Sequence, residues 1–255
     1  MNNIFLTSSF KKLACLSIVL SVFYSCTQLF YINNTLPIDL TMPLAIVKAI
    51  SIVLIAVLVR FFNLKDKVFV NLLFTALIFH SVGDIVIDMT SSVIYPIPFF
   101  LMGHLLYVII LIRTLKFNYY NLALLELGSE LRLKDTKKPN WSKTLKCILL
   151  ITIAVLYTYF SELFLARVHG DELYYAIAAY ILVLTLLAVL TLFHPACFKW
   201  LLIGVSLYII SDCLVAYNQL VTSIPIAKHL AWPLYYFAQA LIVTALINNQ
   251  IEHEI

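Results

Sequence analysis

Charged residues are scarce in this 255-residue chain: Asp, Glu, Lys and Arg make up 12% of it, against about 25% in a typical soluble domain. Glycine is also rare, with five residues, so long flexible segments are not expected. Hydrophobic residues account for 63%, above the roughly 45–50% of soluble domains. These proportions exclude an ordinary soluble domain and predict an integral, multi-pass membrane protein.

Several common site motifs are missing as well. The chain has no Cys-x-x-Cys, no His-Glu-x-x-His and no Gly-x-Ser-x-Gly, so no zinc or other metal site is indicated and a serine hydrolase is disfavoured. The basic residues lie in loops beside apolar runs, which gives a nucleic-acid partner no support. The cysteines are irregularly spaced and are interpreted as buried small hydrophobic residues: Cys15, Cys26, Cys147, Cys197 and Cys213.

Apolar runs of about twenty residues, each long enough to cross about 30 Å of hydrocarbon, occupy most of the chain. The sequence therefore predicts an all-α membrane bundle of eight transmembrane helices, forming a single integral membrane domain over residues 1–255. The predicted spans are 12–32, 43–62, 67–88, 93–114, 144–163, 173–193, 199–219 and 228–248.

The placement of Lys and Arg predicts the orientation. With the N-terminus inside, fourteen of them fall in inside segments and two, Arg167 and Lys228, fall outside, so both termini are expected to be cytoplasmic. The longest inside loop, about 115–142, contains aromatic and basic residues and is interpreted as an interfacial helix, with a regulatory or partner-binding role as the alternative. Short loops and the lack of a targeting peptide favour a bacterial inner membrane.

Polar residues interrupt two of the apolar runs. His80, Asp84 and Asp88 fall at i, i+4 and i+8, on one face of the third predicted span. Ser211 and Asp212 lie in the seventh, with Tyr208 one turn earlier. A carboxylate at the centre of a spanning helix costs roughly 2.5–3.5 kcal/mol, which indicates a function for these acids.

Counting residues from the predicted outer ends places the polar side chains in depth. Those of five spans lie in the outer half of the bilayer, whereas the inner halves are nearly all Leu, Ile, Val, Phe and Ala. This asymmetry predicts one polar cavity, closed towards the cytoplasm and open towards the outer leaflet or the outer aqueous phase. The polar residues concerned are Lys48, His80, Asp84, Asp88, His104, Asp212, Tyr235, Tyr236 and Gln239.

Functional and structural interpretations are both open for the acids and Lys48. Asp84 and Asp212 are candidates for an acid/base pair, or for a structural ion pair with Lys48. Lys48 is a candidate for neutralising the carboxylates or for binding a phosphate. The structural alternative is that Lys48 stands near the start of a span and extends its ammonium to the interface. Asp88 lies near the interface, where a solvated helix end is the simpler interpretation.

The remaining candidates also have structural alternatives. His80 either modifies the acidity of Asp84 from one helical turn away or is a hydrogen-bonded histidine that packs in the interior. His104 is a candidate ligand or proton donor, with Tyr107 on the same helical face. Tyr236 and Gln239 hold a substrate headgroup or make hydrogen bonds between helices.

Four motifs in order resemble the YhhN family of membrane lysoplasmalogenases over most of the chain from about residue 40. In this family Lys-Pro is common where Lys48-Ala49 stands here, and Phe is common at the position of Tyr208. The motifs are Gly83-Asp84, Phe100-x-x-Gly103-His104-x-x-Tyr107, Gly204-x-x-x-Tyr208-x-x-Ser211-Asp212 and Tyr235-Tyr236-x-Ala238-Gln239.

This resemblance implies hydrolysis of the vinyl ether of a lysoplasmalogen, a lysophospholipid of the membrane, to a fatty aldehyde and a glycerophospho-base, either glycerophosphoethanolamine or glycerophosphocholine. It implies that Asp84 and Asp212 are catalytic and that no metal or organic cofactor is needed. The residues expected to bind substrate or support the acids are Lys48, His80, His104, Tyr107, Tyr208, Ser211, Tyr236 and Gln239.

The chemistry agrees with two carboxyl groups in different roles. Protonation of the β-carbon gives an oxocarbenium ion that water captures, so one acid donates a proton while a carboxylate stabilises the cation and activates water, as in glycosidases. We expect Asp84 and Asp212 to face each other across the cavity. The alternatives are a proton-coupled small-solute transporter that uses the same acids as a relay, and a lipid-binding or assembly protein without catalysis.

Overall fold

Seven α-helices make up the part of the chain that the structure describes, and no strand occurs in that part. The structure is a computed structural model that describes residues 41–62, 64–90, 92, 94–128, 143–194 and 198–254, together with Cys15 and Val19. The helices are α2 (Thr41–Phe61), α3 (Lys67–Thr90), α4 (Ile97–Gly128), α5 (Lys143–Leu165), α6 (Leu173–Phe193), α7 (Phe198–Leu220) and α8 (Pro225–Glu254).

The all-α class is confirmed, and α3 to α8 are six helices that are long and apolar enough to cross a membrane. The expected span at 12–32 lies outside the described residues, apart from Cys15 and Val19. The count of eight spans and the cytoplasmic position of the termini therefore stay predictions.

The helix bounds agree with the predicted spans except in α4 and α8. α4 was expected to end near residue 114, but it continues to Gly128 because residues 115–127 contain no Gly or Pro that would end it. The first half of the predicted loop 115–142 is thus a continuation of α4, and residues 129–142 lie outside the described part. α8 begins at Pro225, where proline is well tolerated, and Pro233 lies inside it.

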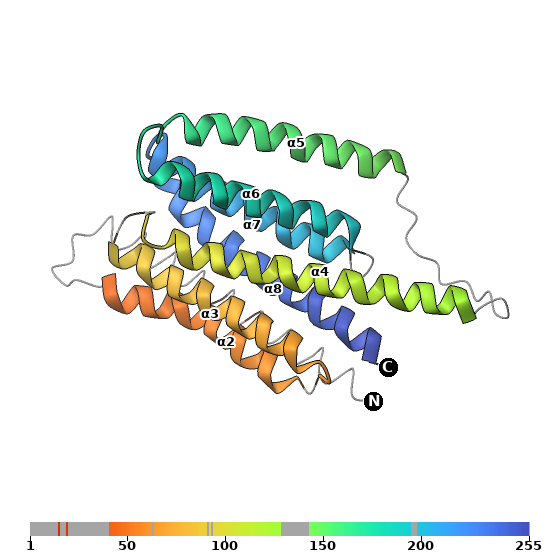
Figure 1. Ribbon diagram of the computed structural model, residues 1–255. Helices are drawn as coiled ribbons and strands as arrows, with labels where there is room; N and C mark the ends of the chain where they lie inside the picture. The colour runs from red at the N-terminus through yellow and green to blue at the C-terminus, as the bar shows by residue number, and fades with distance from the viewer. Residues whose placement is uncertain are drawn as a thin grey trace.

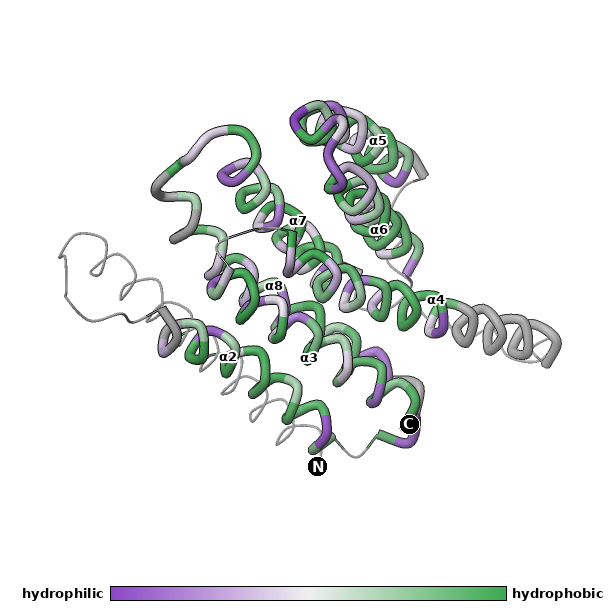
Figure 2. Tube along the Cα trace, turned by 60° about the vertical axis from the view of Figure 1, so that its left-hand side comes forward, coloured by the Kyte–Doolittle hydropathy of each residue, from purple (hydrophilic) through white to green (hydrophobic). Residues whose placement is uncertain are grey.

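Six helices form a closed ring, and the seventh packs outside it. The order around the ring is α2, α3, α4, α6, α7 and α8, which returns to α2, while α5 packs on α6 with a smaller contact to α7 (Figure 1). Among the six candidate spans, α8 is the most buried and α5 the least. Figure 2 shows α5 and α6 together, set apart from α2 and α3. Because α5 packs outside the ring and is the least buried span, we expect most of its surface to face lipid.

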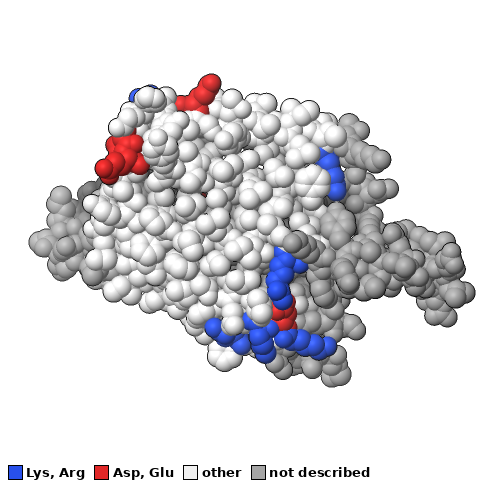
Figure 3. All heavy atoms as spheres, in the orientation of Figure 1, with Lys and Arg blue, Asp and Glu red and all other residues white. Residues whose placement is uncertain are grey.

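Charged side chains gather at opposite ends of the bundle. Arg60, Lys65 and Lys67 lie where α2 ends and α3 begins, and near them Arg113 of α4 pairs with Asp66 at 3.2 Å. We call this the basic end; the acidic side chains in Figure 3 lie mainly at the opposite end, where α5 ends and α6 begins. This separation agrees with the Lys/Arg asymmetry from which the orientation was predicted.

An apolar layer closes the bundle between the basic end and the predicted polar region. Leu77 of α3, Ile110 and Leu111 of α4, and Val243 and Leu246 of α8 are buried there. Beyond that layer are buried polar groups that the sequence analysis did not single out. They include Thr114 and His194, whose Oγ1 and Nε2 atoms are 2.9 Å apart, and Asn249.

The cysteines correct one expectation. Cys15 and Cys147 are exposed and Cys213 is only partly buried, so these three are not core residues. Cys147 belongs to the peripheral helix α5, and the outer surface of a membrane bundle is itself apolar, so a small hydrophobic side chain there needs no burial in protein. Cys26 and Cys197 lie outside the described residues.

Candidate active site

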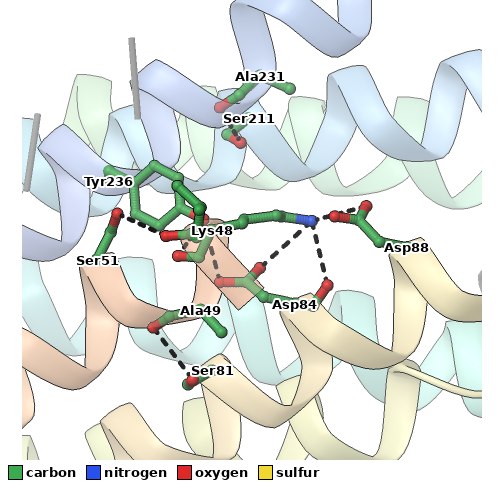
Figure 4. Close-up of polar contacts among 10 residues, drawn as sticks. Lys48, Ala49, Ser51, Ser81, Asp84, Asp88, Ser211, Ala231 and Tyr236 are labelled. Carbon is green, nitrogen blue, oxygen red and sulfur yellow. Dashed lines mark hydrogen bonds and ion pairs between the residues drawn. The ribbon is translucent and has the colours of Figure 1, made fainter. Parts of the chain in front are cut away.

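A buried lysine joins two carboxylates between α2 and α3. Lys48 Nζ lies 3.1 Å from Asp88 Oδ1 and 3.9 Å from Asp84 Oδ1, and it also donates a hydrogen bond of 3.3 Å to the main-chain oxygen of Asp84 (Figure 4). The Lys48 and Asp84 side chains are fully buried, whereas the Asp88 side chain is 16% exposed. With all three groups ionised, this lysine site carries one net negative charge.

Residues of α8 and α3 hold the lysine site in place. The Tyr236 hydroxyl donates a 3.0 Å hydrogen bond to the main-chain oxygen of Lys48 and lies 3.5 Å from Asp84 Oδ2. Lys48 Nζ also lies 3.2 Å from the centre of the Trp232 ring, a cation–π contact. Ser81 donates to the main-chain oxygen of Ala49, which ties α3 to α2. The site is thus fixed by three helices that the closed ring brings together.

The second carboxyl, Asp212, lies in separate surroundings. The Tyr180 hydroxyl of α6 donates a 2.7 Å hydrogen bond to Asp212 Oδ2, and His104 Nε2 of α4 lies 3.7 Å from the same oxygen. The other ring nitrogen of His104 is bonded to the main-chain oxygen of Phe100, four residues earlier. The Asp212 side chain is 16% exposed. Unlike Asp84, Asp212 has no lysine or arginine among the partners that the structure records for it.

Interhelical hydrogen bonds surround these two sites. The Tyr107 hydroxyl of α4 donates to Gln239 Oε1 of α8, and Ser211 of α7 donates to the main-chain oxygen of Ala231 of α8 at 2.8 Å. The bond between Tyr107 and Gln239 is of the kind that the structural interpretation of Gln239 predicted. Together the two bonds fix α8 against α4 and α7.

An apolar cavity with a volume of about 180 Å³ runs beside Asp212. Its wall on α6 extends from Ile177 to Ala188, a separation of eleven residue steps, which is about 16 Å at 1.5 Å per residue. Tyr180 and its hydrogen-bond partner Asp212 lie nearer the Ile177 end of this length, and nearly all of the remaining wall is apolar, from α3, α4, α5, α7 and α8. The cavity is thus almost wholly apolar, with a single carboxyl group in its wall.

The structure brings the predicted residues together in two groups, not one. Asp84 and Lys48 share the lysine site, as the ion-pair interpretation required, and Asp212 and His104 form the other group. Asp212 lines the cavity but Asp84 is not among its lining residues. Tyr235 lines the cavity and packs on Tyr236 with ring centres 5.0 Å apart, so it connects the cavity wall to the lysine site.

Sequence reasoning missed two residues of the site, Tyr180 and Trp232, and gave a third, Asp88, a different role. Asp88 is a direct partner of Lys48 and not a solvated helix end, a role that its i+4 spacing from Asp84 could have indicated. Tyr180 and Trp232 stand in apolar runs without any motif. Among the described residues, no group of three or more His, Cys, Asp or Glu side chains is placed to hold a metal ion.

The fold and the cavity define a class: an integral membrane bundle of helices with an apolar cavity and a carboxyl group in its wall. Residues 44–246 match the model of the YhhN family, which covers most of the chain, and the protein belongs to that family. The family is associated with lysoplasmalogenase activity. No curated protein and no solved structure matches the chain significantly.

Proposed function

We propose that the protein hydrolyses the vinyl ether bond of lysoplasmalogens, releasing a fatty aldehyde and glycerophosphoethanolamine or glycerophosphocholine. The observation that carries this proposal is the position of Asp212, a carboxyl group in the wall of an apolar cavity. Family membership supports it. The proposed host membrane is a bacterial inner membrane, with the basic end towards the cytoplasm.

In the proposed reaction the two aspartates have different tasks. Asp212 reaches the substrate from the cavity wall and donates a proton to the β-carbon of the vinyl ether. The resulting oxocarbenium ion is positively charged, and the net negative charge of the lysine site stabilises it across Tyr235 and Tyr236. Asp84 is part of that negative charge, so both aspartates contribute through their different surroundings. The side chains do this without an organic cofactor.

The substrate orientation follows from the two ends of the cavity. The Ile177 end of the cavity is next to the start of α6 at Leu173, at the end of the bundle that faces the outer aqueous phase in the proposed orientation. The phosphate headgroup of the lysolipid lies at this end. The alkenyl chain extends along α6 towards Ala188, on the side of the basic end. The vinyl ether, which joins headgroup and chain, then lies beside Asp212.

The proposal is tested by aldehyde release from a defined lysoplasmalogen in detergent, with the ester-linked lysophospholipid of the same headgroup as the control. We expect aldehyde from the vinyl ether and no fatty acid from the ester. Absence of aldehyde from a folded protein would contradict the proposal, and uptake of solutes into liposomes would then test the transporter alternative.

The inner end of the cavity is expected to set the chain length. Replacing Ala188, which is buried on α6, with Trp fills the space that the end of a long chain occupies. Exclusion of two methylene groups, at about 0.8 kcal/mol each, would lower kcat/KM for an 18-carbon alkenyl chain roughly tenfold while sparing an 8-carbon chain, which is too short to reach Ala188 from Asp212. The measurement is kcat/KM for both chain lengths.

Leu186→Trp is the matched control, because Leu186 lies on the same helix and is 40% exposed on the outer surface. It should leave the ratio of the two kcat/KM values unchanged. Equal effects of Ala188→Trp on both chain lengths would show that the chain does not reach Ala188.

A further inference from the structure

A cluster of buried rings fills the space between Asp212 and the lysine site. The His80 ring of α3 lies 5.1 Å from the His104 ring and 5.7 Å from the Tyr208 ring, measured between centres. Tyr208 in turn lies 4.8 Å from His104 and 5.2 Å from Tyr235. We call His80, His104 and Tyr208 the histidine–tyrosine cluster. None of the three lines the apolar cavity, so the cluster lies next to Asp212 but outside the cavity wall.

The polar atoms of the cluster have few partners within the protein. Nε2 of His104 and the hydroxyl of Tyr208 are buried and make no hydrogen bond to another described residue, and the buried His80 ring has a hydrogen-bond partner only in the backbone of Ala76 on its own helix. Buried polar groups are nearly always satisfied by protein or by ordered water. A buried water needs two to four polar partners, and these three neighbouring rings provide that many.

Close packing against Gly103 fixes the His80 ring. A Cβ atom at Gly103 would lie 2.6 Å from Nε2 of His80 and 2.7 Å from its Cε1, which is closer than real contacts allow. The imidazole therefore occupies space that only glycine leaves open on α4. The ring is therefore held in position mainly by packing, with the backbone of Ala76 as its hydrogen-bond partner.

We propose that the histidine–tyrosine cluster binds the water molecule that captures the oxocarbenium ion. This inference rests on the proposed function and adds a binding site for the second substrate, water. A hydrolase in an apolar cavity needs a local supply of water, and the cluster provides polar atoms next to Asp212, just outside the apolar wall, with His104 Nε2 3.7 Å from Asp212 Oδ2.

The step balances with these groups alone. Asp212 gives its proton to the β-carbon, which forms a C–H bond and leaves the positive charge on the ether carbon and oxygen. The oxygen of the bound water forms a bond to that carbon and returns one proton to the Asp212 carboxylate. The hemiacetal so formed breaks its bond to the glycerol oxygen, which takes the hydroxyl proton, and the aldehyde leaves.

Methanol trapping tests the inference, because methanol competes with the bound water for the oxocarbenium ion. Capture by methanol gives a stable methyl acetal that keeps the glycerophospho-base, and mass spectrometry measures its ratio to aldehyde. In Tyr208→Phe we expect this ratio to rise about fivefold, the size expected for the loss of one hydrogen bond to water. His80→Gln and Gly103→Ala, which displaces the His80 ring, should raise it too.

Tyr175→Phe is the control, since Tyr175 is exposed on α6 and loses the same hydroxyl group. Its acetal-to-aldehyde ratio should equal that of the wild-type protein. An unchanged ratio in Tyr208→Phe and His80→Gln, with an active wild-type protein, would overturn the water site alone. Absence of aldehyde from the wild-type protein would overturn the proposed function and the water site together.

Discussion

Replacing Asp212 with Asn is expected to lower kcat for aldehyde release about 100- to 10,000-fold, the range that general acid–base groups contribute. Asp212 is the carboxyl group in the cavity wall, and an amide cannot donate the proton that the β-carbon requires. Asn still accepts the hydrogen bond from Tyr180, which is 2.7 Å long in the wild-type protein, so the fold should be kept. KM should change much less than kcat.

The measurement compares kcat, KM and thermal unfolding in detergent for Asp212→Asn and wild type. Glu162→Gln provides the control, because Glu162 is an exposed acid on α5 near the same end of the bundle. It should match wild type in every measurement. A folded Asp212→Asn protein with near-normal kcat would exclude Asp212 as the proton donor.

The spans were predictable because length and hydrophobicity dictate them in a membrane. α6 has the predicted bounds, and α7 differs by one residue at each end. The ring of helices was not predictable, because apolar residues cover all sides of these spans and give no face a preferred neighbour. The continuation of α4 to Gly128 was missed because hydropathy marks where a helix leaves the membrane, not where it ends.

The acids were predictable individually, since each stands out in an apolar run. Their partners were predictable only in part. The Lys48–Asp84 pair was one of two interpretations, but its formation, and the pairing of Lys48 with Asp88, depend on how α2 and α3 are rotated about their axes, which one sequence does not determine. Tyr180 illustrates the limit, because nothing around it in α6 marks it as the hydrogen-bond donor to Asp212. Spacing along one helix predicts a shared face, whereas contacts between helices need the packed structure.

Removing the ammonium of Lys48 is expected to destabilise the protein strongly. Lys48→Met leaves Asp84 and Asp88 without their cation, and breaking a buried ion pair from one side costs about 3–5 kcal/mol. Arg113→Met provides the control, because the Arg113–Asp66 pair is 47% and 25% exposed and should contribute less than about 1 kcal/mol. The measurement is the free energy of unfolding of the three proteins in the same detergent.

Asp84→Asn, the variant at the carboxylate that pairs with Lys48, separates the structural role of Asp84 from its role in the reaction. Asp84→Asn keeps the 3.1 Å pair between Lys48 and Asp88, so we expect it to unfold much less readily than Lys48→Met. It removes the net negative charge of the lysine site, so kcat should still fall, by about 100-fold, as when one electrostatic contact to a transition state is lost. The double variant Lys48→Met/Asp84→Asn should regain part of the stability that Lys48→Met loses, because fewer carboxylates remain unpaired, but none of the activity. Full activity in a stable Asp84→Asn protein would restrict Asp84 to the structural ion pair and leave Asp212 as the catalytic carboxyl.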